Sequence, residues 1–461
     1  MESAIASSKI ERRKQGKALR EKLPRTSQSE WKLRSKAKDI IKLLKESDTD
    51  RIPGLIPVKY QRMALSPFTF FRGTAILQAR DLANASVSGI MVQACGDCHL
   101  ANFGGFASPE RMLVFDINDF DETFPGPWEW DIKRLGASLI LAARDRGFSK
   151  TLAHQAAREA AASYRERMSE FAEMSVLDAW YARISIDALK EHFRKDQDIS
   201  ARLSRKQKQA RSQNSEAIVP KLTETANGGR KFRDNPPVIY HFQEYAENVE
   251  KGYAKFIEQY KKSLQADRQQ LFEHYDLKDS AIKAVGVGSV GTRCFLALFL
   301  ADQDDPLFLQ IKEARRSVLE SPRGRSRYTH QGLRVVEGQR LMQAASDIFL
   351  GHARSKQHDF YIRQFRDMKV SAEIETFRPS TLVAYATMCG WALARAHAKA
   401  GDAAMISGYL GSTDQFDSAL AQYSEAYADQ AERDYETFQK AIRSGRLSTE
   451  SEKRAGLEFL L

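Results

Sequence analysis

Two neighbouring segments, VQACGDCHLANFGG at residues 92–105 and LVFDINDFDE at residues 113–122, decide how the sequence is interpreted. Apolar runs at residues 90–94 and 112–115 flank a Gly-rich polar loop, which predicts a β-hairpin. Asp97 and Asn102 lie in the loop, and Asp116 ends the second run. Phosphoryl transfer needs a carboxylate that orients the attacking hydroxyl, and an amide and a second carboxylate that hold Mg²⁺. The hairpin therefore predicts Asp97 as the catalytic group and Asn102 and Asp116 as metal ligands.

The same loop allows other interpretations. Asp, Asn and Gly are ordinary turn residues. CGDCH at residues 95–99 matches the C-x-x-C-H haem-attachment pattern, and C-x-x-C is also a redox or zinc pattern. Haem attachment needs export, but residues 1–25 are charged and lack an apolar h-region. A structural zinc site needs two further ligands, whereas Cys294 and Cys389 are distant. Buried free cysteines are the favoured prediction.

A second motif, GVGSVG at residues 286–291, is a G-x-G-x-x-G followed by strand-like residues 292–300 instead of a helix. That order disfavours a dinucleotide-binding fold. It resembles the glycine flap over ATP phosphates in kinases, which predicts Gly286, Gly288, Ser289 and Gly291 as phosphate contacts. Lys312 in FLQIKEA ends a later strand and predicts the phosphate-binding lysine, with Glu337 as its helical partner. A turn, a solvent-facing lysine and a surface glutamate are the alternatives for the separate pieces.

Composition sets the broad class of the protein. The chain has 461 residues, 42% of them hydrophobic, with 71 Lys plus Arg against 60 Asp plus Glu, a net charge of +11. The longest apolar runs fall short of the roughly 20 residues that span a bilayer, so we expect a cytoplasmic protein with no membrane partner. The basic excess lies in residues 10–38, 194–211 and 315–327. Such runs are usually solvated faces, so nucleic acid is an unfavoured but open partner.

The periodicity predicts an α+β fold with four parts. Residues 1–50 form a helical arm. Residues 51–275 form a helical lobe with the hairpin at 90–121 and, at 200–237, a polar segment that is interpreted as a loop or a partly ordered insertion. Residues 276–370 form a β-rich nucleotide-binding lobe, and residues 371–461 are C-terminal helices that complete the helical lobe.

GDCHLANFG and VFDINDFDETFPGPWEWDIKRL resemble the catalytic and metal segments of aminoglycoside and choline kinase-like proteins. With SPFTFFRG, VGVGSVGTR, GLRVVEGQRLMQAASDIFLG and YIRQFRDMK, the chain closely resembles the bacterial family catalogued as domain of unknown function 2252, over roughly residues 50–440. The resemblance implies a two-lobed protein kinase-like fold with a mostly helical C-lobe and a small antiparallel β N-lobe. The fold would be circularly permuted, because the glycine loop follows the catalytic loop.

The resemblance implies ATP and Mg²⁺ as cofactors and Asp131 as a structural aspartate. Cys95 departs from the kinase-like pattern, which has His there, and Asp119 and Asp121 compete with Asp116 as metal ligands. Possible contacts of an anionic substrate are His99, Arg72, Arg315 and Arg316. A solvated loop is the alternative for the two later arginines, and pairing with a core carboxylate is the alternative for Arg72.

Three functions fit these residues. The leading hypothesis is an ATP- and Mg²⁺-dependent phosphotransferase of unknown substrate. Nucleotidyl (AMP) transfer on the same fold is the second. The third is a non-catalytic pseudokinase or scaffold that binds acidic partners, which predicts steeply salt-dependent binding.

Overall fold

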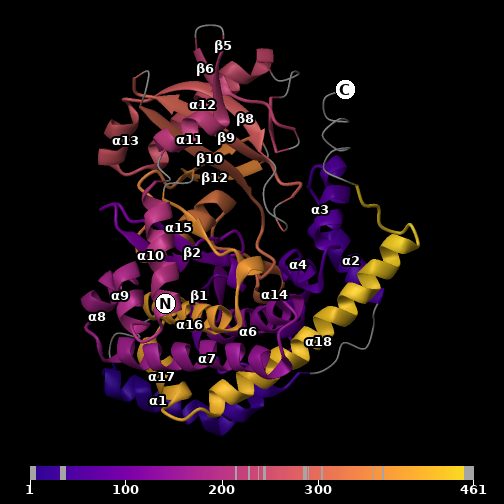
Figure 1. The fold of residues 1–461 in the computed structure, drawn as a ribbon, viewed down its shortest axis with the longest axis vertical. Coiled ribbons are helices and arrows are strands. Elements are labelled where there is room, and N and C mark those ends of the chain that lie inside the picture. The colour runs from indigo at the N-terminus through magenta and orange to yellow at the C-terminus, as the bar shows by residue number, and fades with distance from the viewer. Residues whose placement is uncertain are drawn as a thin grey trace.

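The computed structural model describes residues 7–31, 38–212, 215–226, 229–236, 238–241, 246–283, 288, 290–302, 305–356, 358–365 and 368–450. Helices and sheet are mixed, as the α+β prediction required (Figure 1). The helices are α1 (Lys9–Lys22), α2 (Lys38–Ser47), α3 (Ile56–Met63), α4 (Pro67–Arg72), α5 (Ala75–Leu82), α6 (Trp128–Asp145), α7 (Lys150–Glu173), α8 (Val176–Tyr181), α9 (Ile186–His192), α10 (Gln197–Arg211), α11 (Ser215–Leu222), α12 (Ala246–Ser263), α13 (Ala266–Phe272), α14 (Glu320–Arg323), α15 (Gln331–Met342), α16 (Pro379–Ala400), α17 (Ala403–Leu410) and α18 (Gln415–Arg443). The strands are β1 (Met91–Ala94), β2 (Phe103–Ala107), β3 (Leu113–Ile117), β4 (Phe124–Pro127), β5 (Thr223–Ala226), β6 (Gly229–Phe232), β7 (Ile239–Tyr240), β8 (Asp276–Lys283), β9 (Cys294–Leu300), β10 (Pro306–Ala314), β11 (Gly351–Ser355), β12 (His358–Gln364) and β13 (Val370–Ser371).

A six-stranded antiparallel sheet with the order β11-β12-β10-β9-β8-β7 lies at one end of the molecule (Figure 1). Side chains alternate between its faces along each strand. Ala297 and Phe299 of β9 pack toward the core that includes Phe256 of α12, and Leu296 and Leu298 pack toward the core that includes Ile218 of α11. Both faces are therefore covered, which explains why every residue of the central strand β10 is buried.

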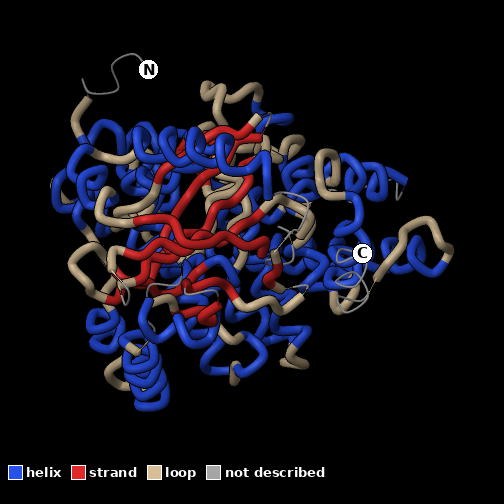
Figure 2. Tube along the Cα trace, turned by 90° about the horizontal axis from the view of Figure 1, so that it is seen from above, coloured by secondary structure: helices blue, strands red, loops and turns tan. Residues whose placement is uncertain are grey.

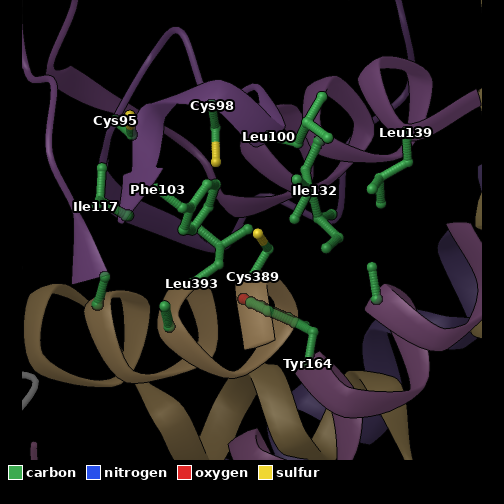
Figure 3. Close-up of a cluster of buried hydrophobic side chains, with 14 of the residues drawn as sticks. Cys95, Cys98, Leu100, Phe103, Ile117, Ile132, Leu139, Tyr164, Cys389 and Leu393 are labelled. Carbon is green, nitrogen blue, oxygen red and sulfur yellow. The ribbon is translucent and has the colours of Figure 1, made fainter. Parts of the chain in front are cut away.

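The helical body at the other end is built around α6, α7, α16 and α18 (Figure 1). Seen from above, the strands lie among helices (Figure 2). α6 is buried from Trp128 to Ala143, so its apolar residues extend around the helix instead of forming one stripe. Cys95, Cys98 and Cys389 lie in this core with Tyr164 and Leu393 (Figure 3). All four cysteines are free and buried, as the sequence predicted.

The predicted hairpin is wrong in its pairing. β1 pairs with β4, and β3 pairs with β2, which also pairs with β13. The Gly-rich segment that was predicted as a loop is itself strand β2. Its glycines permit a close approach, because a Cβ on Gly104 would lie 2.4 Å from the carbonyl oxygen of Val370. Glycine weakens the sequence signal of a strand, which is why β2 was missed.

Two further differences concern polar segments. Residues 200–237 are not a simple loop, because α10, α11 and the β5–β6 hairpin occupy most of the described part. The N-terminal helix α1 is mostly exposed, but it packs on α17 through Gly16, where a Cβ would lie 2.0 Å from the Met405 carbonyl oxygen. In both segments the polar composition gave no sign that one face packs against the rest of the protein. Among the described residues, no helix has the length and apolar character needed to cross a membrane.

Candidate active site

The loop after β1 is held in shape by Asp131 of α6. One carboxylate oxygen of Asp131 accepts the amide of Cys95 at 2.6 Å, and the other accepts the amide of Gly96 at 2.9 Å. His397 of α16 lies 3.2 Å from the same carboxylate. Gly96 has φ of +85°, and a Cβ there would lie 2.3 Å from the Glu122 carbonyl oxygen, so no other residue fits. These contacts fix the backbone immediately before Asp97.

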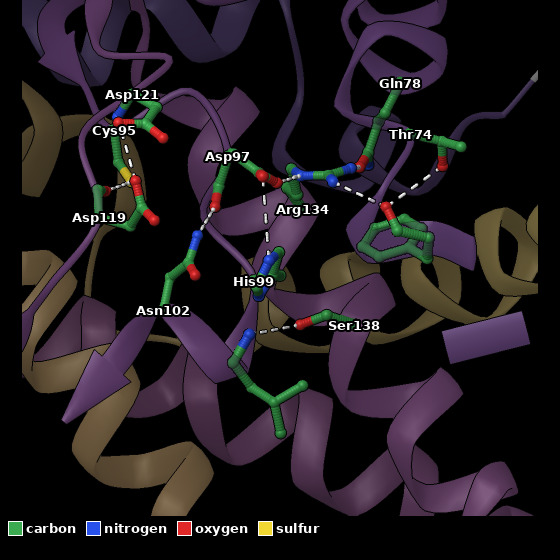
Figure 4. Close-up of polar contacts among 12 residues, drawn as sticks. Thr74, Gln78, Cys95, Asp97, His99, Asn102, Asp119, Asp121, Arg134 and Ser138 are labelled. Carbon is green, nitrogen blue, oxygen red and sulfur yellow. Dashed lines mark hydrogen bonds and ion pairs between the residues drawn. The ribbon is translucent and has the colours of Figure 1, made fainter. Parts of the chain in front are cut away.

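Asp97 lies between a buried arginine and the metal-binding candidates (Figure 4). Arg134 Nε donates to Asp97 Oδ1, and His99 Nε2 lies 3.8 Å from Asp97 Oδ2. The Nδ2 group of Asn102 donates to the backbone oxygen of Asp97 at 2.8 Å, which leaves the amide oxygen of Asn102 available to another partner. Burial raises the pKa of Asp97, and the guanidinium groups of Arg134 and Arg72 oppose that rise.

Lys312 of β10 reaches the loop that follows β3. Its Nζ lies 2.9 Å from Asp121 Oδ2 and 3.9 Å from Asp119 Oδ2. The hydroxyl of Tyr361 on β12 donates to Asp121 Oδ1 at 2.6 Å. Lys312 and Tyr361 are register partners across β10 and β12, so the sheet itself places both groups on Asp121. The contact links the six-stranded sheet to the loop after β3.

The charges of this group are strongly coupled. Burial lowers the pKa of Lys312, but the attraction of Asp119 and Asp121 outweighs burial and leaves the pKa well above its ordinary value. Burial raises the pKa of Asp119, and the neighbouring Asp121 raises it further. The pKa of Asp121 is lowered, because Lys312 and the Tyr361 hydroxyl outweigh its burial. Lys312 is therefore a charged ammonium group at neutral pH.

Asp116 lies apart from this group, inside the core. Its side chain is fully buried, and both carboxylate oxygens lie 3.0 Å from Nη2 of Arg395. The amides of Ile117 and Ala344 also donate to it, each at 2.8 Å. These partners satisfy a buried charge. The choice of Asp116 as a metal ligand therefore does not fit its surroundings, and Asp119 is the aspartate of this segment that lines the cavity described below.

The glycine loop is described only in part, since Gly286 and Ser289 lie outside the described residues. A Cβ on Gly288 would lie 3.2 Å from the carbonyl oxygen of Arg72, at the end of α4. Gly291 has φ of +87°, and its carbonyl accepts the amide of Ile52 at 2.8 Å. The loop thus rests on residues 52 and 72 of the helical body.

Four other predicted residues lie in surroundings that differ from those expected. Glu337 lies on α15, but its carboxylate pairs with Arg340 at 3.2 Å, and the acidic partners of Lys312 are Asp121 and Asp119. Arg315 donates to the backbone oxygens of Ser47 and Thr49, and so fastens the N-terminal segment. Arg316 is exposed, and His99 is only 3% exposed. His99 is thus a buried neighbour of Asp97.

A cavity of about 710 Å³ adjoins Lys312 and Asp119, between the sheet, α15 and α10. Among the described residues, seven cationic and three anionic side chains line it. These are Arg111, Lys206, Lys221, Lys283, Lys312, Arg363 and Lys369, with Asp119, Asp347 and Glu373. The cationic excess favours an anionic ligand. The volume lies within the range typical of small-molecule sites.

A divalent cation fits the oxygen donors present here. Within the described part of the chain, no three His, Cys, Asp or Glu side chains form a group that could hold a metal alone. Mg²⁺ instead commonly binds one or two carboxylates, with the remaining positions taken by water and phosphate. Asp119 Oδ2 and the amide oxygen of Asn102 lie in neighbouring segments, since the amide of Asn118 donates to the Asn102 carbonyl at 2.8 Å. This donor set suits a magnesium–phosphate complex.

The comparison with protein families agrees with the resemblance carried by the motifs. A family model described as "Uncharacterized protein conserved in bacteria (DUF2252)" matches residues 51–441. The chain belongs to this family. No curated protein and no solved structure matches the chain significantly.

The matched DUF2252 region contains several residues of the site that the motifs did not predict. Arg134 binds Asp97, Tyr361 binds Asp121, and Arg395 binds Asp116. Arg363 also lines the cavity and donates to the Asn118 carbonyl at 3.0 Å. One signal was available: the apolar run at residues 360–365 predicts a strand, and Arg363 lies two residues after Tyr361 on it, so both share a face. Arg134 and Arg395 lie on apolar helices and had no such signal.

Proposed function

We propose that the protein is an ATP- and Mg²⁺-dependent phosphotransferase with a circularly permuted kinase-like fold. The observation that carries this proposal is the contact of Lys312 with Asp121 and Asp119, beside a cationic cavity and next to the Asp97 loop. A strand lysine, acidic residues after a strand and an Asp-x-x-x-x-Asn loop are the parts that phosphoryl transfer uses. The order of these parts along the chain differs from that of ordinary kinases, but a site depends on where its groups lie in space.

Each group has a distinct role in this proposal. Lys312 contacts the phosphates of ATP, and its charge is already maintained by Asp119 and Asp121. Asp119 and Asn102 hold Mg²⁺, which neutralises charge on the phosphates when bound. Asp121 orients Lys312 through the ion pair and through Tyr361. Asp97 accepts the proton of the attacking hydroxyl, and Arg134 fixes the direction of its carboxylate.

Asp119 is tested as a Mg²⁺ ligand by substitution. We expect Asp119→Asn to weaken Mg²⁺-dependent ATP binding by about tenfold or more, because a neutral amide replaces a charge-bearing ligand. ATP affinity measured without Mg²⁺ is expected to change far less. Calorimetric titration of ATP with and without Mg²⁺ measures both. The matched control is Asp187→Asn, a surface carboxylate that is 80% exposed, which is expected to leave both affinities unchanged.

The reaction type is tested by mass spectrometry after incubation with Mg²⁺ and ATP. Phosphoryl transfer adds a phosphate to the protein or to a candidate acceptor and releases ADP, whereas nucleotidyl transfer adds AMP and releases pyrophosphate. We expect ADP as the product, with release of phosphate to water when no acceptor is present. Pyrophosphate as the product would replace the proposal with AMP transfer. Absence of both products across a panel of hydroxyl-bearing acceptors would contradict an enzymatic function.

A further inference from the structure

Arg72, the last residue of α4, has a half-buried side chain. Its Nε is buried without a hydrogen-bond partner, and no hydrogen bond or ion pair joins its side chain to another described residue. Within the described part of the chain, the ring of Phe68 lies 5.8 Å from the guanidinium carbon. Arg134 and Arg334, by contrast, each donate to three or more acceptors. A buried donor without an acceptor is unfavourable, so an absent acceptor is expected to complete Arg72.

The position of Arg72 relative to Asp97 is fixed by Arg134. Arg134 Nε donates to the Asp97 carboxylate, and its Nη2 donates to the carbonyl of Phe71 at 3.0 Å. One guanidinium group therefore joins the residue before Arg72 to Asp97. On its other side, the Arg72 carbonyl lies against Gly288 of the glycine loop. Arg72 thus lies between the Asp97 loop and the glycine loop.

The charges of Arg72 and Lys312 act on different carboxylates. Lys312 contacts Asp121 and Asp119, which belong to the nucleotide and metal end of the proposed site. The charge of Arg72 acts on Asp97 and lowers its pKa. A carboxylate that accepts the proton of the attacking hydroxyl faces the acceptor. A cation beside that carboxylate therefore faces the acceptor as well.

We propose that Arg72 binds an oxyanion, a phosphate or a carboxylate, carried by the acceptor substrate beside Asp97. The inference rests on the proposed phosphotransfer, in which the acceptor is the molecule that receives the phosphoryl group. It assigns that acceptor to the class of anionic compounds. It selects one arginine from the sequence-based candidates. Arg315 is bonded to backbone oxygens, and Arg316 is exposed. A guanidinium suits this role because its planar donors match the oxygens of a phosphate or carboxylate.

The experiment uses inorganic phosphate as the probe and the full chain. Phosphate is titrated into wild type, Arg72→Ala, Arg72→Lys and Arg316→Ala by calorimetry, with acetate as a second probe and thermal unfolding as the check on folding. We expect Arg72→Ala to weaken phosphate binding at least tenfold, since a charge-assisted contact is lost. Arg72→Lys is expected to recover part of the affinity, and Arg316→Ala to retain all of it. Mg·ATP and Mg·ADP are titrated into wild type and Arg72→Ala in parallel.

Each outcome decides the question. Phosphate affinity that Arg72→Ala leaves unchanged overturns the inference. A loss of Mg·ATP affinity in Arg72→Ala without a matching loss for Mg·ADP also overturns it, because Arg72 would then bind the γ-phosphate of the nucleotide. If wild type binds no nucleotide but binds phosphate through Arg72, the proposed function fails and the anion site stands. If nucleotide binds and the phosphate affinity of Arg72→Ala equals that of wild type, the anion site fails and the proposed function stands.

Discussion

Replacing Asp97 by asparagine is expected to lower ATP-dependent turnover by about a thousandfold, while Mg·ATP affinity stays within about twofold of wild type. Asparagine has the same shape and keeps an oxygen that accepts from Arg134 Nε, so the loop is expected to hold. It cannot accept a proton at neutral pH. Steady-state and single-turnover kinetics with ATP measure the loss. Asp187→Asn again serves as the surface control.

The raised pKa of Asp97 adds a pH test to this prediction. Because the proposed role needs the carboxylate form, turnover falls as the pH decreases through the pKa of Asp97. Since that pKa is raised by burial, the acidic limb of the rate profile is expected above the range of an ordinary aspartate. The limb is expected to vanish from the residual activity of Asp97→Asn. A variant that retains wild-type turnover, or an unchanged acidic limb, would contradict the role of Asp97.

The second large effect is on stability. Arg395 and Asp116 are both fully buried, and Arg395 Nη2 also donates to the backbone oxygen of Met342. Arg395→Met removes the counter-charge but leaves the buried carboxylate, which is expected to cost about 3–5 kcal/mol of folding free energy. Urea unfolding followed by circular dichroism measures the loss.

A double variant isolates the cause of that loss. Adding Asp116→Leu to Arg395→Met removes the uncompensated charge, so we expect the double variant to be more stable than Arg395→Met alone. Asp116 is the residue before the last residue of β3, and the loop that contains Asp119 follows this strand. Both variants are therefore also expected to weaken Mg·ATP binding. A loss below about 1 kcal/mol for Arg395→Met would show that the pair does not anchor this strand.

The elements with strong periodicity were predictable from the sequence. Helical apolar spacing predicts helices over residues 331–345 and 380–400, and a short apolar run predicts a strand over residues 360–365. α15, α16 and β12 begin and end close to these ranges. β2 was missed because glycine gives a strand no apolar pattern, although the close contact of Gly104 with Val370 requires glycine there. The polar helix α10 was missed because it buries few residues. In these segments the secondary structure depends on which neighbouring residues pack on them.

The site was predictable in its residue types and less so in its partners. Asp97, Asn102 and Lys312 were found from motif spacing, and contacts link their segments in the structure. Asp116 was predicted as a metal ligand beside Asp119 because it ends an apolar run. The strand continues to Ile117, however, and the core partner of Asp116 is Arg395, 279 residues away. Pairing between distant residues leaves no signal in one sequence. The same reason explains why Glu337 was assigned to Lys312 in place of Asp121.

Lys312, Asp119 and Asn102 are proposed to form a site for ATP and Mg²⁺. The most direct test is calorimetric titration of ATP into the full-length protein, with Mg²⁺ and with excess chelator, for wild type and for a Lys312→Met variant shown to be folded by its thermal transition. The account predicts saturable binding of one ATP per chain, strengthened by Mg²⁺ and weakened at least tenfold in Lys312→Met. Absence of saturable binding to wild type, or equal binding by Lys312→Met, would contradict it.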